Sequence, residues 1–196
     1  MSNTTSGTHP DDSALTTDDR IIHATLTLIS EHGLGAVTMS RVADVADVAR
    51  QTLYNHYGDI DSIVAAAIDR HNRESMDLLT AALQVAETPT EKIEQVVRHF
   101  VMVGAHTHDT MDFGSGLSPD VRASLDSYDE AVEGHIRSIL EDGQESGEFR
   151  ADLQREIDTV LTRSLLNGIS ELAGDAPDRA AQIATAGTRT ILAALR

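Results

Sequence analysis

The sequence predicts an all-α protein with an N-terminal three-helix headpiece, which contains a helix-turn-helix, and a C-terminal helical domain. Apolar residues recur at helical spacing in one segment after another, and no segment shows the period-two alternation of a strand. Residues 38–57 divide into two short amphipathic segments around a position suited to a tight turn. We therefore expect a disordered polar tail at 1–15, the headpiece at 16–62 and the second domain at 63–196.

The first helix is expected from about Asp18 to His32. Thr16 and Asp19 have the spacing of a capping box, and Gly33 stands where a helix commonly ends. Its predicted core stripe is Ile22, Thr25, Leu26 and Ile29.

Two short helices follow, and the turn between them is the most informative part of the chain. Thr38 is a suitable N-cap for the first. Asp47 stands at the turn, where aspartate is one of the few non-glycine residues that tolerate the left-handed region. The second helix is expected from about Ala49 to His56, with Leu53 facing inward and polar side chains outward. Such a surface can enter the major groove of DNA.

The segment from Ala46 to Tyr57 resembles the recognition motif of TetR-family repressors, and Thr-Leu-Tyr-x-His-aromatic at 52–57 is its most specific part. The resemblance covers roughly the first third of the chain and implies a homodimer with a DNA-binding headpiece and a C-terminal effector domain. Three positions depart from the pattern: Asp47 replaces Gly, Ala49 replaces Ser or Thr, and Ile60 replaces Lys. The missing side-chain cap at residue 49 should cost about 1 kcal/mol, and the missing lysine removes one phosphate contact.

Residues at the start of the second short helix are the best candidates for reading bases. Arginine pairs with guanine and glutamine with adenine, so we expect base contacts from Arg50, Gln51 and Thr52. The resemblance implies phosphate contacts for Thr38, Tyr54 and His56. Ser40 and Arg41, at the start of the first short helix, could reach a phosphate or a base edge. Phosphate contacts position the headpiece rather than specify sequence. The full predicted DNA-binding set is Thr38, Ser40, Arg41, Arg50, Gln51, Thr52, Tyr54, Asn55 and His56.

Five further helices are predicted after the two short ones. The first is capped by Asp59, continues to about Leu83 and joins the headpiece to the second domain, and the next starts at Thr88-Pro89. After an irregular stretch at 106–118, a helix starts at Ser118-Pro119 and is expected to end at Gly143. The last two are expected from Asp152 to about Ala173, and from Pro177 onward.

Small residues stand among large aliphatic ones in the last two helices. They either pack the monomer or, as the resemblance implies, form a four-helix dimer bundle. The predicted dimer-interface set is Ser164, Leu165, Gly168, Ile169, Ala184, Gly187 and Ile191. For an effector pocket the candidates, which alternatively only fill the core, are Phe100, Met102, Phe113, Tyr128 and His135. Because aromatic residues are only 3% of the chain, an aliphatic, apolar small-molecule effector fits better than an aromatic one.

The chain is strongly acidic, with a formal net charge of −17. Even the headpiece carries seven carboxylates against three arginines, and Lys92 is the only lysine. A halophile's cytoplasmic protein explains this composition better than a high-GC genome does.

Several classes of protein and site are disfavoured. There is no cysteine, so disulfides and thiolate metal sites are excluded, and no apolar run is long enough to span a membrane. We expect a soluble cytoplasmic protein that has no cofactor and is not an enzyme, because the chain carries no catalytic or dinucleotide fingerprint. A loop cluster could coordinate a metal but is more typical of a polar linker; it comprises His106, His108, Asp109 and Asp112.

The sequence therefore predicts a DNA-binding transcriptional regulator, a homodimeric repressor that a small-molecule effector releases from a palindromic operator. The acidic headpiece motivates one alternative, a helical ligand- or metal-binding protein that has lost DNA binding.

Overall fold

The computed structural model of the chain describes residues 15–106 and 118–196, and within these ranges the fold is all-α, as predicted. The helices are α1 Thr17–His32, α2 Met39–Val45, α3 Arg50–His56, α4 Ile60–Val85, α5 Pro89–His106, α6 Pro119–Ser146, α7 Arg155–Asp175 and α8 Ala180–Leu195. Short 3-10 turns at Leu34–Ala36 and Pro177–Arg179 precede α2 and α8. Phe113, His108, Asp109 and Asp112 lie outside the described residues.

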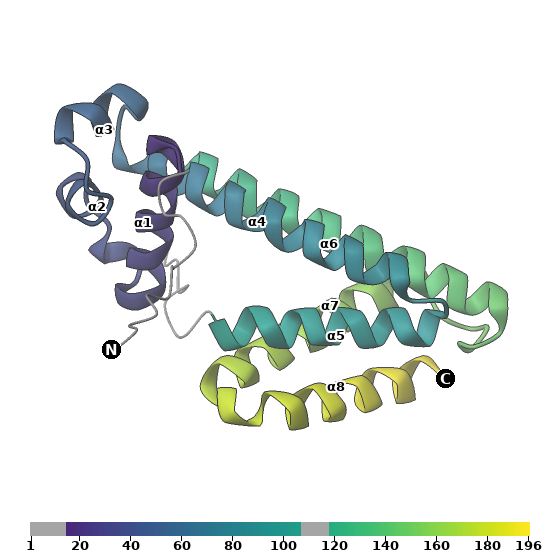
Figure 1. Ribbon diagram of the computed structural model, residues 1–196. Helices are drawn as coiled ribbons and strands as arrows, with labels where there is room; N and C mark the ends of the chain where they lie inside the picture. Colours follow the sequence, from purple (N-terminus) through teal and green to yellow (C-terminus); the bar gives the residue numbers. More distant parts are fainter. Residues whose placement is uncertain (1–14, 107–117) are drawn as a thin grey trace, which may run out of the picture.

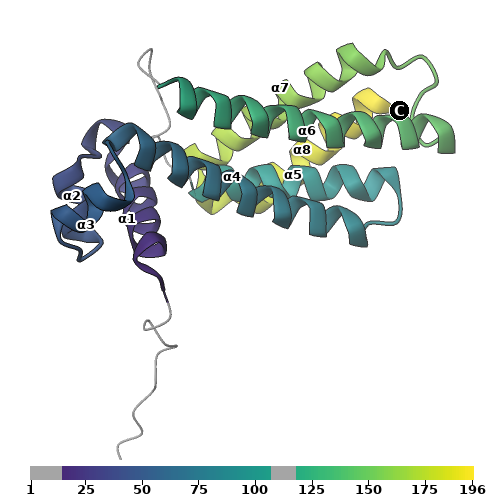
Figure 2. The same ribbon diagram turned by 90° about the horizontal axis from the view of Figure 1, so that it is seen from above.

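Helices α1, α2 and α3 form a headpiece at one end of the molecule, and α4 and α6 run side by side away from it (Figure 1). Helix α5 packs mainly against α7 and α8, and it also contacts α4 and α6. Viewed from above, the five long helices make an elongated body with the headpiece at its tip (Figure 2). This arrangement leaves the headpiece exposed on the side that faces away from the body.

Side-chain caps start most of the helices at the positions that the sequence predicts. Thr16 and Asp19 form the expected capping box of α1, and the Asp59 carboxylate accepts from the backbone N–H of Ser62 over 2.8 Å. Thr88 and Glu91 cap α5 reciprocally, with bonds of 3.1 Å in both directions. These caps satisfy backbone donors that the first turn of a helix leaves without partners.

The predicted core stripe of α1 needs one correction. Ile22, Thr25 and Ile29 are buried, but Leu26 is only half-buried. The face between α2 and α4 is centred on Ile21, Ala24, Thr25 and Leu28, which recur at i, i+3, i+4 and i+7. Leu26 lies at the edge of that face.

The predicted end of α6 at Gly143 is wrong, because the helix continues to Ser146 and ends at Gly147 in the left-handed conformation, with φ of 76°. Gly143 is buried beneath the ring of Phe149, and a Cβ at this position would lie 2.0 Å from Cδ2 of that ring. Glycine at 143 thus serves close packing, whereas glycine at 147 serves the backbone turn.

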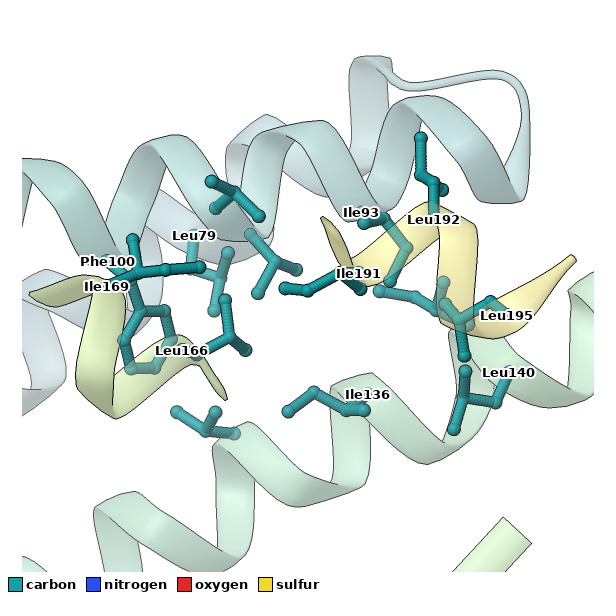
Figure 3. Close-up of a cluster of buried hydrophobic side chains, with 14 of the residues drawn as sticks. Leu79, Ile93, Phe100, Ile136, Leu140, Leu166, Ile169, Ile191, Leu192 and Leu195 are labelled. Carbon is teal, nitrogen blue, oxygen red and sulfur yellow. The ribbon is translucent and has the colours of Figure 1, made fainter. Parts of the chain in front are cut away.

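Two apolar cores hold the molecule together. The larger one fills the body between α4, α5, α6, α7 and α8, and Figure 3 shows its side chains meeting from these helices. The smaller one lies in the headpiece but extends into α4 through Ile63, Val64 and Ile68. Val121, from the first turn of α6, is also buried in it at 2% exposure. The body therefore contributes directly to the headpiece core.

Helix α7 leaves most of its large apolar side chains exposed. Its buried face is made of Thr159, Thr162, Leu166, Ile169 and Ala173. The exposed large apolar side chains of the same helix are Ile157, Val160, Leu161, Leu165 and Leu172. An apolar face that the monomer leaves uncovered is a feature of surfaces that bind another protein.

Candidate nucleic-acid interface

The turn between α2 and α3 has a fixed geometry. Asp47 has a φ of 52°, the left-handed conformation expected from the sequence. The backbone N–H of Val48 donates to the carbonyl of Ala43 over 3.0 Å, and the Arg20 guanidinium of α1 donates to the carbonyl of Asp47 over 2.7 Å. These bonds set the angle between the two short helices.

Helix α3 is anchored by Leu53, which is completely buried. Its N-cap residue, Ala49, has extended backbone angles and no side-chain capping bond, in accord with the missing Ser or Thr. The side chains on its outer surface are exposed, except that Thr52 is half-buried; the exposed set is Arg50, Gln51, Tyr54, Asn55 and His56. A short helix with a single apolar anchor thus presents a polar face to solvent.

Several predicted DNA-contacting side chains bind one another on this surface. The Arg50 guanidinium donates to the Ser40 hydroxyl of α2, and the Gln51 side-chain amide donates to Oδ1 of Asn55 over 3.1 Å. These bonds restrict side-chain freedom before a partner binds. An adenine contact by Gln51 would replace its bond to Asn55.

The side chains at the start of α2 are held by hydrogen bonds to nearby backbone groups. Thr38 caps the helix by accepting from the backbone N–H of Arg41 over 3.3 Å. The Arg41 guanidinium donates to the Ala36 carbonyl over 3.2 Å. All nine predicted DNA-binding residues therefore lie on α2, α3 and the cap of α2, on one continuous structural unit.

A network behind the recognition helix was missed by the sequence reasoning. The Tyr57 hydroxyl donates to the Asp18 carboxylate of α1 over 2.6 Å, and the Arg70 guanidinium of α4 donates to Asp19 over 3.0 Å. Burial raises the pKa of the Tyr57 phenol, and the nearby Asp18 charge raises it further. The Thr16 hydroxyl, followed by Arg70, lowers the pKa of Asp19. Pairings this distant along the chain leave no local signal.

The predicted effector-pocket residues lie in different places. Phe100 is buried, with the Arg163 guanidinium 4.8 Å above its ring, and the Tyr128 hydroxyl lies 3.3 Å from Nε2 of His99. Nε2 of His135 lies 3.4 Å from the Thr80 hydroxyl, and both residues line a small groove between α4, α5 and α6. Met102 lines a groove of about 450 Å³ between α1, α4 and α5. Of the described residues of the predicted set, Met102 and His135 line two different grooves, whereas Phe100 lies in the core of the body and Tyr128 packs against that core.

The predicted dimer-interface residues fall into two groups. Ser164 and Leu165 are exposed and Gly168 has open space around it, so all three lie on the outer surface. The buried group, which packs within the monomer, is Ile169, Gly187 and Ile191. A Cβ on Gly187 would lie 2.6 Å from Cδ1 of Ile169, so this glycine allows α7 and α8 to approach closely. Ala184 is half-buried at the α5–α8 groove.

Two further properties concern the described part of the chain. Within residues 15–106 and 118–196, no group of three or more histidine or acidic side chains has the geometry of a metal site. No described helix combines the length and hydropathy needed to cross a bilayer.

Comparisons with known proteins agree with this architecture. The HTH-type transcriptional regulator BetI of Rhizobium meliloti (strain 1021) is 30% identical over 78 residues, which cover 40% of this chain and 38% of that relative's length. The reduced form of Escherichia coli NemR matches with a TM-score of 0.78 at 17% identity, covering 92% of this chain and 98% of that one. The transcriptional regulator FadR from Bacillus subtilis, in complex with stearoyl-CoA, gives 0.74 at 16% identity, with 90% and 98% covered. At these identities, the structural matches show the fold.

Family models account for both domains. Residues 21–67 match the model described as bacterial regulatory proteins, tetR family. Residues 86–171 match the tetracyclin repressor-like C-terminal domain. Members of this family are DNA-binding regulators, not enzymes. The chain belongs to the TetR family of bacterial regulatory proteins.

Proposed function

We propose that the chain is a homodimeric transcriptional repressor that binds a palindromic operator and is released by an apolar small-molecule effector. The observation that carries the proposal is the exposed polar face of α3, held on one side by α2 and from behind by the contacts of Tyr57 and Arg70 to α1. A rigid support of this kind fixes a recognition helix in the orientation that a major groove requires.

The outer surface of α7 supports the dimer. Leu161 and Leu172 are more than half exposed, and Gly168 between them has open space that admits a second helix at short distance. The groove of about 810 Å³ beside it, between α7 and α8, is lined mainly by small and aliphatic residues. A two-fold axis through this surface would place two headpieces on the two halves of a palindrome.

The groove between α1, α4 and α5 is the best candidate for the effector. Its walls include the apolar side chains of Leu26, Leu78 and Met102, and His71 and Glu74 add polar groups. A ligand there would contact both the headpiece and the body, and so would change the orientation of one relative to the other. Stearoyl-CoA in the Bacillus subtilis FadR complex supports an effector with an aliphatic portion.

The first experiment measures binding to the DNA upstream of the protein's own gene, with Arg50→Ala beside the wild type. The control is Arg73→Ala, since Arg73 is exposed on α4 and pairs with Asp69 over 2.8 Å, away from the recognition surface. A base contact by Arg50 predicts a loss of about 1–3 kcal/mol that is largest for the preferred sequence, with the control unchanged. No retardation of any DNA by the wild type would contradict the proposal and favour a ligand-binding protein without DNA affinity.

A salt series tests how an acidic headpiece binds a polyanion. With only three arginines against seven acids at 16–62, few counterions are released, and neutral donors such as Thr38, Ser40 and Tyr54 carry phosphate contacts. We expect affinity to fall only slowly with salt, which also screens the acidic repulsion over roughly 10 Å at 0.1 M and about 3 Å at 1 M. Such behaviour suits a high-salt environment. A steep slope would show that many cationic contacts form after all.

The dimer is tested by sedimentation of Leu165→Glu with Leu172→Glu. Both side chains are exposed on α7 at 41% and 57%, so two charges there should leave the monomer folded while dissociating the dimer. Val85→Glu is the control, because Val85 is 76% exposed at the end of α4, away from that surface. A double variant that remains dimeric, with unchanged helicity, would remove the claim.

A further inference from the structure

A further groove lies between α5 and α8. Figure 1 shows these two helices on the side of the body away from the recognition helix. Its volume is about 540 Å³, within the range of small-molecule sites. It shares none of its lining residues with the groove between α1, α4 and α5. The two surfaces are therefore separate.

Three arginines converge on this groove in a chain that has 32 acidic and 15 basic residues. Arg98, Arg189 and Arg196 line it, whereas Glu94 is the only carboxylate side chain among its lining residues. This concentration of positive charge is unusual for a chain of net charge −17. A local cationic cluster on an acidic protein is a candidate site for a negatively charged ligand.

The guanidinium groups of these arginines form few and weak ion pairs with carboxylates of the protein. Arg98 Nη2 lies 3.8 Å from Glu94 Oε2, a loose exposed pair on adjacent turns of α5. Arg196 donates to the Thr90 hydroxyl over 3.1 Å, and that hydroxyl in turn donates to Glu148. Arg189 forms no ion pair within the described ranges. Each arginine therefore retains N–H donors for an anion, which guanidinium groups bind in a bidentate manner.

The floor of the groove is apolar. Leu192 is 9% exposed at its base, and Ala184 and Ala193 flank it on α8. The hydroxyl groups of Thr185 and Thr188 lie on the same helix, although Thr185 already donates to the Ala181 carbonyl over 2.9 Å. A ligand that fills this groove must combine a short aliphatic part with a charged head.

We propose that the α5–α8 groove binds a small amphiphilic anion, a carboxylate or phosphate monoester on a short aliphatic chain, with Arg98 and Arg189 holding the charged head. The aliphatic part covers Leu192 and the neighbouring alanines. The site does not depend on DNA binding, so it stands or fails separately from the proposed repressor function.

The test is calorimetric titration of the full chain with octyl phosphate and octanoate. Replacing Arg98→Gln and Arg189→Gln together removes two guanidiniums from the groove. The control replaces Arg122→Gln and Arg137→Gln, two exposed arginines of α6 outside the groove, and so changes the net charge by the same amount. We expect about tenfold or greater weakening of the better probe in the groove variant and less than about twofold in the control. Equal weakening in both variants would reduce the effect to overall charge and overturn the site.

Two further measurements define the ligand and its position. Inorganic phosphate should bind more weakly than octyl phosphate, because it lacks the aliphatic part; equal affinity would overturn the role of the apolar floor. Amide chemical shifts should move at Thr188 and Ala193 on addition of the better probe. Shifts centred instead on Leu78, in the other groove, would overturn the assignment, as would binding of an oligoglutamate peptide with no response to either amphiphile.

Discussion

The hydroxyl of Tyr57, just after the recognition helix, donates a 2.6 Å hydrogen bond to the carboxylate of Asp18 in the first turn of α1. Asp18 also lies 4.0 Å from Nδ1 of His56 and 3.9 Å from the Arg70 guanidinium of α4. One carboxylate therefore connects the end of α3, the start of α1 and the helix that leads into the body. Helix α4 and the end of the recognition helix thus share a contact through this group.

Tyr57→Phe should lower the free energy of unfolding by about 1 kcal/mol, because the phenol loses its bond to a charged acceptor that is partly exposed. Chemical denaturation measures the change. Tyr54→Phe serves as the control, since Tyr54 is 53% exposed and should leave stability unaltered. A double-mutant cycle with Asp18→Ala, which removes the acceptor, should give a coupling energy of similar size, and additive effects would contradict the bond.

Two glycines make a matched pair for close packing. A Cβ on Gly104 would lie 2.0 Å from the backbone carbonyl oxygen of Ser170, where α5 crosses α7. Gly104→Ala should therefore destabilise the protein by about 2–3 kcal/mol or more. Gly134 lies on the exposed face of α6 and has nothing within 4 Å of an added Cβ. Gly134→Ala should therefore stabilise the protein by about 0.5–1 kcal/mol. Thermal unfolding that shifts both variants in the same direction would contradict this reading.

Because the imidazole of His99 is buried, the free energy of unfolding should depend on pH. The imidazole lies 3.1 Å from the Ser75 hydroxyl and 3.3 Å from that of Tyr128, and burial lowers its pKa to about 4, with a smaller effect from His71. Since the folded pKa lies below the unfolded value of about 6.5, the associated stability is complete above pH 6.5 and is lost as pH falls towards 4. The loss should be on the order of 2–3 kcal/mol.

The measurement is urea denaturation across that pH range, with His99→Gln beside the wild type. The variant keeps a polar group near Ser75 but cannot gain a proton, so its stability should change less between pH 6.5 and 4. Parallel pH profiles for the two proteins would assign the acid sensitivity to other groups.

Ala49→Ser should strengthen the recognition helix. Residue 49 has the extended backbone angles of an N-cap, with φ of −64° and ψ of 141°, but its side chain makes no capping bond. A serine hydroxyl there would accept from a backbone N–H of the first turn and stabilise the protein by about 1 kcal/mol. Ala131→Ser, at an exposed interior position of α6, should instead cost a few tenths of a kcal/mol. Thermal unfolding of both variants decides whether position matters.

Local signals account for what the sequence predicted well. The capping box at Thr16, the left-handed turn at Asp47 and the inward position of Leu53 each follow from neighbouring residues, and all are confirmed. The α6 terminus was misplaced because glycine at 143 and glycine at 147 look alike until Phe149 is seen to cover the first. Sequence cannot state which of two glycines is needed for space rather than for backbone angle.

In the candidate site, too, features that depend on neighbouring residues were predicted and contacts between distant segments were not. The motif on α3 was readable because its spacing is local, whereas the Tyr57–Asp18 bond joins segments whose proximity depends on the whole headpiece. On α7, hydrophobicity alone could not assign inside and outside, because Thr159 and Thr162 are buried and Leu161 is exposed. The apolar face therefore indicated a helix correctly without indicating the direction in which that face points.

The burial of Val121 in the headpiece core has a consequence for the order in which the chain folds during synthesis. The first three helices and the start of α4 leave the ribosome well before α6 does, so for that interval the core around Ile63 and Ile68 lacks one of its members. A nascent chain halted before residue 119 would carry an incomplete headpiece. Native-state hydrogen exchange should accordingly show the amides of α1 and the first turn of α6 opening together, as a single cooperative unit that crosses the domain boundary.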